Sequence, residues 1–295
     1  MSTGIVTQAA PAATRIETPR RRRRRRAMNV PAGIGAVIWL LIVVLPVYFI
    51  VITSLRLSES YLSDGALTLP SAVTLDAYRR VFELDFGKFM INSLIVTVSV
   101  IVLVISLALP AAYAIVRNTS QLVRTAFTVL LLGLAIPAQA VIIPIYLVIT
   151  RLKLYDTLPA VILPTAAFAL PLAIVVLTST LRDIPSELYE AMTVDGARTG
   201  KIFRMLVIPL SGGGVTTIAI FSGLSAWNGV LFPLILTQSE QRRVIPLGLY
   251  NFQGQYGTDI PGLMAAVVLS ALPVLVMYVF GRRYLLRGLT AGAGK

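Results

Sequence analysis

The acidic side chains that could do chemistry in this chain gather in one polar segment. Outside the stretch 56–88, the clustered acids are Asp183, Glu187, Glu190 and Asp195. An enzyme would need an ionisable pair close to its reaction site, and this group is the one candidate. The chain has no histidine and no cysteine, which excludes histidine-based acid–base catalysis, thiolate chemistry and Cys/His zinc sites. The sequence therefore argues against an enzyme and against a metal site.

Two glycine–lysine stretches come close to a phosphate-binding loop without matching it. Such a loop needs G-x-x-x-x-G-K-[ST], so that backbone N–H groups and a lysine surround the phosphates. Between Gly196 and Gly200 there is one residue too few, and Ile202 stands where the hydroxyl should be. Between Gly288 and Gly294 there is one residue too many. We therefore expect this chain to bind no nucleotide or other cofactor.

Six intervals without any charged side chain make up most of the remaining sequence. They run over 27–55, 89–116, 125–150, 157–181, 205–239 and 260–281. Only 13% of the residues are charged, whereas a soluble domain has about 25%. A helix needs about 20 apolar residues to cross a bilayer, and helices satisfy their own backbone hydrogen bonds in lipid. The sequence predicts an all-α integral membrane protein with six transmembrane helices, at about 31–55, 89–116, 126–150, 157–181, 208–236 and 260–281.

The distribution of charge predicts the orientation. With six spans, both termini lie on one side, together with the connections 117–124 and 182–204. The whole net charge of +13 falls on that side, and the other side is neutral. The positive-inside rule assigns the basic side to the cytoplasm, so both termini are expected there.

The arginine run Arg20–Arg26 precedes the first predicted span. We interpret it as a topology anchor that also contacts anionic lipid headgroups. Nucleic-acid or lipid-specific binding is the less favoured alternative, because no aromatic residues interleave the run. The sequence thus divides into a disordered Arg-rich cytoplasmic segment (1–29), a transmembrane domain (30–286) and a cytoplasmic tail (287–295).

The segment 56–88 on the opposite side has an amphipathic pattern. Leu75, Tyr78, Val81 and Phe82 recur at helical spacing between charged residues. This predicts a helix that lies along the membrane interface. A solvated connector is nearly as well supported by the same residues.

The cytoplasmic segment 182–209 is the long polar loop of the chain and has the pattern of two helices. Pro185 suits a first helical turn, and Glu187 and Glu190 lie near the positive end of the helix dipole. Gly196 breaks that helix, since glycine adopts the left-handed conformation of a tight turn. The second helix is expected from about Ala197 to just before Pro209. Its apolar face carries Phe203, Leu206 and Val207, and its basic face carries Arg198, Lys201 and Arg204.

These residues resemble the EAA signature of ABC importer permeases, in which EAA, three residues, Gly and nine residues precede I-x-L-P. Here Glu190-Ala191-Met192, Gly196 and Leu206-Val207-Ile208-Pro209 stand at the same offsets. Asp195 and Ala197 flank the glycine. Asn92-Ser93-Leu94, Trp227-Asn228 and the ending from Gly288 are similar to the maltose-type (MalG-like) carbohydrate branch. The resemblance covers about residues 30–295 and leaves the Arg-rich segment unexplained.

The resemblance implies a type I ABC importer permease in a prokaryotic plasma membrane. Such a permease pairs with a second, related permease, with two copies of a cytoplasmic ATPase that bind ATP and Mg, and with an extracytoplasmic solute-binding protein. It further implies that the loop docks on the ATPase. By this interpretation the coupling residues are Glu187, Glu190, Ala191, Asp195, Gly196, Ala197, Arg198, Phe203 and Pro209.

The absence of charge inside the spans disfavours an ion-coupled transporter and suits a neutral solute such as a sugar. Candidate residues along its path are Asn92, Gln139, Tyr146, Trp227 and Asn228. Hydrogen bonding between helices is an alternative role for each of them. A permease of the same architecture for a peptide, polyamine or phosphonate remains a second hypothesis. A membrane enzyme or scaffold is a third.

Overall fold

The computed structural model describes residues 30–59, 61, 65, 67–70, 72–254 and 257–291, the last twelve as helix backbone only. The segment 1–29, with its arginine run, and the final four residues lie outside the described residues. The chain divides into two compact units, residues 1–45 and 46–295, and each is considered by itself.

The described part of the first unit is one apolar helix segment. It is the first part of α1 (Val30–Ser54), and its side chains are exposed on every face, Trp39 among them at 68%. A helix that is apolar all round is stable only in apolar surroundings. This helix matches the predicted span at 31–55.

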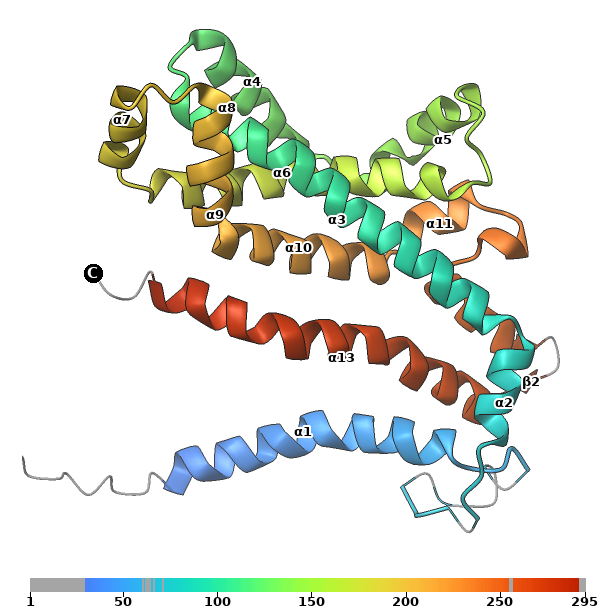
Figure 1. Ribbon diagram of the computed structural model, residues 1–295. Coiled ribbons are helices and arrows are strands. Elements are labelled where there is room, and N and C mark those ends of the chain that lie inside the picture. The colour runs from blue at the N-terminus through green and yellow to red at the C-terminus, as the bar shows by residue number, and fades with distance from the viewer. Residues whose placement is uncertain are drawn as a thin grey trace, which may run out of the picture. The chain divides into compact units, whose positions relative to one another are not determined.

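Four long helices build the core of the second unit: α3 (Phe86–Arg117), α6 (Leu158–Arg182), α10 (Gly212–Trp227) and α13 (Ile260–Ala291). Helix α3 packs along α6 and α10, and α10 also contacts α13 (Figure 1). Helix α10 also lies close to α6. Gly214 on α10 allows this approach, since a Cβ at that position would collide with the side chain of Thr180 on α6. Membrane helices commonly pack through such small residues. Helix α13 continues through residue 291, so the predicted tail from 287 begins as helix.

The third predicted span, 126–150, is not one straight helix. It consists of α4 (Gln121–Leu132), the short turns η1 (Gly133–Ala135) and η2 (Ala138–Val141), and α5 (Ile142–Arg151), with a bend of 98° between its halves. The cause is Pro137. A proline disfavours helical backbone in the residue before it, and Ile136 is extended, with φ −86° and ψ 114°.

The fifth predicted span, 208–236, is broken as well. The helical run α8 (Thr199–Ile202), η3 (Phe203–Val207) and α9 (Ile208–Leu210) meets α10 at a bend of 71° near Ser211. After α10 the chain leaves the helix at 228–230 before α11 (Leu231–Leu236). By length and composition, four of the described helices can span a membrane, and the number is six if each bent pair is one span. The predicted all-α membrane fold is confirmed.

Helix α2 (Asp76–Glu83) occupies part of the segment 56–88. Its buried face is Ala77 and Val81, whereas Leu75 and Phe82 are 67% and 61% exposed. The predicted helix is present, Val81 of its expected apolar face packs into the protein, and the contact of Leu75 and Phe82 with the membrane interface stays a prediction. Ala77 and Val81 stand four residues apart and pack with Phe86 in one cluster, so the smaller residue and not the larger ones faces the core.

Short elements complete the chain between α11 and α13. They are η4 (Glu240–Arg242), α12 (Ile245–Gly248), η5 (Leu249–Phe252) and the two-residue strands β1 (Gln253–Gly254) and β2 (Gly257–Thr258), which pair antiparallel. Two carboxylates form hydrogen bonds between segments in this part of the chain. Asp259 accepts hydrogen bonds from Arg80 on α2 at 2.9 and 3.2 Å and from the Gly262 amide at the start of α13. Asp156 accepts hydrogen bonds from the amides of Gln238 and Ser239 at 2.8 and 3.0 Å.

Candidate coupling segment and candidate solute path

The first arm of the coupling segment (residues 182–209) is helix α7 (Ser186–Val194). Pro185 was predicted to lie in the first turn of this helix. It is instead the N-cap residue, one position before the first turn, with φ −55° and ψ 136°. Glu187 and Glu190 are both exposed, and neither forms an ion pair among the described residues. Acidic side chains in a first turn are favoured by the helix dipole. The arm thus presents unpaired negative charge on its surface.

The turn at Gly196 is a Schellman motif. The Ala197 amide donates to the carbonyl of Met192 at 2.9 Å, and the Gly196 amide donates to the carbonyl of Thr193 at 3.0 Å. Gly196 has a φ of 75°, the left-handed conformation that glycine adopts without a Cβ penalty. Asp195 is the last residue before this turn and is exposed, as is Ala191 within α7. The motif fixes the direction in which the second arm leaves.

The second arm runs past its predicted end. It begins at Thr199 and continues through Pro209 to Leu210, and not from Ala197 to just before the proline. Proline lacks an N–H and its ring displaces the carbonyl four residues earlier, and the run Phe203–Val207 before it is π-helical. The wider π turn accommodates the proline without ending the helix. Leu206 and Val207 are buried.

The basic side chains of this second arm face outward. Arg198, Lys201 and Arg204 are exposed. The coupling segment therefore presents an acidic arm and a basic arm, with Pro209 exposed at its end. Such a pair of charged arms is a surface that a partner of mixed charge could bind.

Three aromatic rings join both arms to the end of α3; we call them the aromatic cluster (Tyr113, Tyr189 and Phe203). The ring centroid of Tyr113 lies 6.4 Å from Tyr189 in a stacked arrangement and 5.6 Å from Phe203. These distances lie within the range of favourable aromatic pairs. Arg117, also on α3, places its guanidinium carbon 4.6 Å from the centre of the Tyr189 ring, a cation–π geometry. The cluster connects a membrane-spanning helix to both arms.

Tyr189 is the buried member of this cluster, with 2% of its surface exposed. Burial raises the pKa of its hydroxyl, with a smaller contribution from Tyr113, while Arg117 opposes the change. Its hydroxyl forms no hydrogen bond among the described residues. The ring, and not the hydroxyl, therefore holds α7 in place.

Two of the predicted path residues use their polar groups inside the fold. Asn92 donates both amide hydrogens, at 2.8 Å, to the carbonyls of Gln241 and Arg243. Trp227 is 5% exposed and its indole N–H donates to the carbonyl of Ser270 at 3.2 Å. The structure thus places these two residues in contacts between segments.

The other three predicted path residues are exposed. Gln139 belongs to η2 at the break of the third span, and Asn228 ends α10 and donates to the carbonyl of Leu224 at 2.9 Å. Tyr146 lies on α5 with its ring centroid 5.6 Å from that of Tyr155. Gln139 therefore lies at the break of the third span and Asn228 lies where the chain leaves α10, whereas Tyr146 lies within a helix.

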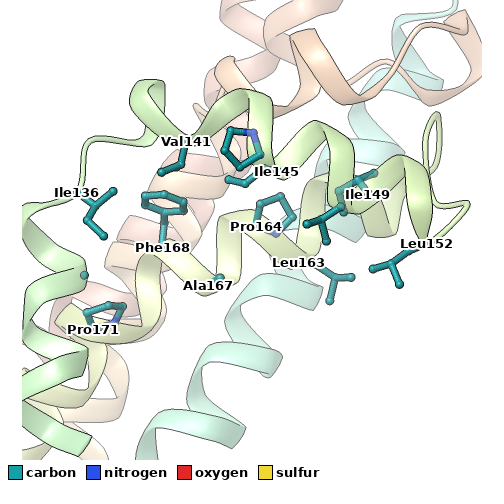
Figure 2. A pocket seen from close by; sticks show the side chains of 13 residues that line it. Ile136, Val141, Ile145, Ile149, Leu152, Leu163, Pro164, Ala167, Phe168 and Pro171 are labelled. Atoms are coloured by element: carbon teal, nitrogen blue, oxygen red, sulfur yellow. The ribbon is translucent and has the colours of Figure 1, made fainter.

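Two cavities adjoin α6. The larger, which we call the apolar pocket, has a volume of about 500 Å³ between α5 and α6 and is lined by the residues in Figure 2, all with hydrocarbon side chains or glycine. The smaller, which we call the α6–α10 cavity, has a volume of about 360 Å³, and Thr165 and Ser225 are among the residues that line it. Phe168 lines both.

Comparison with known proteins identifies the family. The model of the family "Binding-protein-dependent transport system inner membrane component" matches residues 105–290, more than half of the chain. The chain belongs to this family. A Caldicellulosiruptor protein described as an ABC transporter permease is 37% identical over 258 residues, which cover 88% of this chain and 94% of that protein. The trehalose transport system permease protein SugB of Mycobacterium tuberculosis is 35% identical over 254 residues, covering 85% and 92%.

A solved structure shows the same fold. It is a crystal structure of a bacterial ABC transporter involved in the import of the acidic polysaccharide alginate, with a TM-score of 0.77 and 23% identity. The match covers 90% of this chain and 99% of that chain. The chain is thus a multi-pass membrane permease with the fold predicted from its charge-free intervals.

Sequence reasoning did not single out Tyr113 and Arg117, which contact Tyr189, or Thr165 and Ser225, which line the α6–α10 cavity. Tyr113 and Tyr189 stand 76 positions apart in the chain, and no local pattern indicates that they stack. Thr165 and Ser225 lie in mainly apolar helices that carry other hydroxyl side chains, such as Thr178 and Ser222, and their spacing does not distinguish them. The one available signal was the position of Tyr113, Arg117 and Ser225 near the end of a span, and Thr165, inside α6, lacked even that.

Proposed function

We propose that this chain is the membrane-spanning permease subunit of an ATP-binding-cassette importer that carries a sugar or oligosaccharide into the cytoplasm. Similarity over most of the chain to a trehalose transport permease carries this proposal. The charge-free spans support it, because a neutral, hydroxyl-rich solute needs no ionised partner in the membrane. The basic face of the chain lies in the cytoplasm, with both termini.

The coupling segment binds the ATPase in this proposal. Glu190 and Glu187 on α7 are exposed and meet basic groups of the ATPase, while Arg198 meets an acidic group. The aromatic cluster passes the displacement of the arms to α3. A second permease completes the path, two ATPase copies bind ATP and Mg, and a binding protein delivers the sugar from outside. The hydrolysis of ATP takes place on the ATPase and not on this chain.

Purification of the chain from its native membrane in mild detergent tests the assembly. Mass spectrometry is expected to find a P-loop ATPase, a second permease and a solute-binding protein in the same fraction. Trehalose, maltose and a dipeptide are then offered to the isolated binding protein. Binding of a sugar supports the proposal, and binding of the dipeptide alone would replace it with an importer of another solute.

Charge reversal at Glu190 tests the docking. Glu190→Arg is expected to reduce the ATPase that co-purifies by about thirtyfold or more, because removing one partner of a charge pair that is buried and hydrogen-bonded in the interface costs about 2–5 kcal/mol, and about 1.4 kcal/mol is a factor of ten. The spans stay folded, since the side chain is exposed. Glu83→Arg on α2 is the matched control, because it reverses an exposed acid outside the coupling segment and is expected to retain the ATPase. Equal recovery for both variants would contradict the docking role.

A further inference from the structure

The α6–α10 cavity lies beside both broken spans. Thr165 and Phe168 of α6 form one wall of the cavity, and Ser225 of α10 forms another. Residues 229–233, which follow the end of α10, complete the lining on this side. Leu134 and the start of η2 at the other break also reach it. Backbone that leaves the helix at membrane depth is tolerated where it is buried in protein or lines a water-filled cavity. Two breaks at one cavity indicate a place where polar groups of a solute replace the lost helical contacts.

The wall of this cavity combines hydroxyls with aromatic rings. Thr165 donates its hydroxyl hydrogen to the carbonyl of Val161 at 2.7 Å, so its oxygen remains an acceptor. Ser225 is exposed and supplies a second hydroxyl. The rings of Phe168 and Phe232 lie 5.6 Å apart, centroid to centroid. A pyranose ring presents hydroxyls at its rim and C–H groups on its faces, and this wall offers a partner to each.

The side chains in this wall are all uncharged. An acidic sugar would bring a carboxylate that no basic group neutralises, and burying an unpaired charge is strongly unfavourable. A neutral sugar carries no such cost. The uncharged wall therefore favours a neutral sugar over an acidic one.

The apolar pocket provides the contrast. It is larger, at about 500 Å³, but no side chain around it can form a hydrogen bond (Figure 2). A sugar there would lose its hydrogen bonds to water without replacement. Of the two cavities on α6, the smaller one has the chemistry for a sugar.

We infer that the α6–α10 cavity is a transit site for one neutral glycosyl unit of the transported sugar, an inference that rests on the proposed function. Thr165 and Ser225 form hydrogen bonds to its hydroxyls, and Phe168 and Phe232 pack against its face. This assigns the sugar contacts of the chain to residues other than Asn92 and Trp227, whose polar groups are already used inside the fold.

The absence of native cysteine permits a direct test in the assembled transporter with its binding protein. Ser225→Cys is labelled with a small methanethiosulfonate reagent, and the label on this chain is measured by mass spectrometry with and without trehalose or maltose. With saturating sugar, labelling is expected to slow by about tenfold, the factor that applies when sugar occupies the site for about nine-tenths of the time. Gln238→Cys, exposed and outside the cavity, is the control and is expected to label at an unchanged rate.

A functional pair complements the labelling. The double change Thr165→Val and Ser225→Ala removes both hydroxyls at little cost in volume and is expected to lower sugar uptake by about tenfold, the effect of two hydrogen bonds. Leu163→Ala in the apolar pocket is the matched control and is expected to transport at the native rate.

The outcomes separate the two claims. If the native complex transports no sugar, the proposed function fails. If it transports trehalose or maltose while Ser225→Cys is unprotected, or is not labelled even without sugar, the inference alone fails. Native uptake by the hydroxyl-free variant would overturn the inference in the same way. Protection at Ser225 without protection at Gln238 supports it.

Discussion

The aromatic cluster provides the sharpest prediction about coupling. The change is Tyr113→Ala, which removes the ring that contacts both Tyr189 on α7 and Phe203 on the second arm. We expect the coupling segment to detach more often from α3, so that ATP hydrolysis continues while less sugar is moved per ATP. Tyr113→Phe retains both ring contacts and is the matched control.

The magnitude follows from the two ring pairs. Each pair contributes about 0.5–1.5 kcal/mol beyond its buried area, so the loss is about 1–3 kcal/mol. Since about 1.4 kcal/mol corresponds to a factor of ten in an equilibrium constant, the detached population should rise by about 5- to 150-fold. Arg117 keeps its contact with Tyr189, which limits the effect on the fold.

Two measurements on the assembled transporter check the prediction. Hydrogen exchange of the amides in α7 and in 199–207 reports attachment, and the ratio of sugar uptake to ATP hydrolysis reports coupling. Faster exchange with a lower ratio is expected for Tyr113→Ala, and native values for Tyr113→Phe. Native exchange in Tyr113→Ala would refute the reasoning about attachment. Faster exchange with a native ratio would show that the cluster seats the segment without transmitting its motion.

Three further predictions concern other positions. Gly196→Val should impair assembly with the ATPase because a β-branched residue resists a φ of 75°, whereas Gly200→Ala, with open space around it, should assemble normally; co-purification distinguishes them. Tyr189→Phe should leave the thermal midpoint of the transporter unchanged or raise it, since the hydroxyl is buried without a partner among the described residues; a clear fall would reveal a bond formed in another state. Hydrogen bonds from the amides of Gln238 and Ser239 lower the pKa of Asp156 from its ordinary 3.8, so the attachment of the segment 237–239 is fully present above about pH 4 and lost as the pH falls through the lowered pKa. Limited proteolysis at a series of pH values from 5 downward should show this loss setting in below pH 3.8 in the native chain, while Asp156→Ala should be cleaved alike throughout the series.

The sequence predicted those features that depend on neighbouring residues. The charge-free intervals indicated the spans because hydropathy is a local property, and Gly196 indicated the turn because few other residues adopt its conformation. The bend at Pro137 was not predicted, because prolines also lie inside the continuous helices α1, α3, α6 and α13 and hydropathy does not register backbone direction. The continuation of the second arm through Pro209 was missed because the π turn before it has no composition of its own.

The other features that the sequence did not predict depend on contacts between segments that are far apart in the chain. Asn92 has the polarity of a path residue, but its partners Gln241 and Arg243 are about 150 positions away. The same holds for the ring of Tyr113 and for the hydroxyls of Thr165 and Ser225. Their roles depend on how α3, α6 and α10 pack, and spacing along the chain carries no information about that.

The broken third span has a consequence for biogenesis. Helix α4 has 12 residues and α5 has 10, so at 1.5 Å per residue they are about 18 and 15 Å long, and neither alone crosses an apolar layer of about 30 Å. The two halves must therefore enter the membrane together, as one broken span or as a re-entrant loop with a bend of 98°, and the opened backbone between them must be covered by neighbouring protein, because lipid offers it no hydrogen-bond partner.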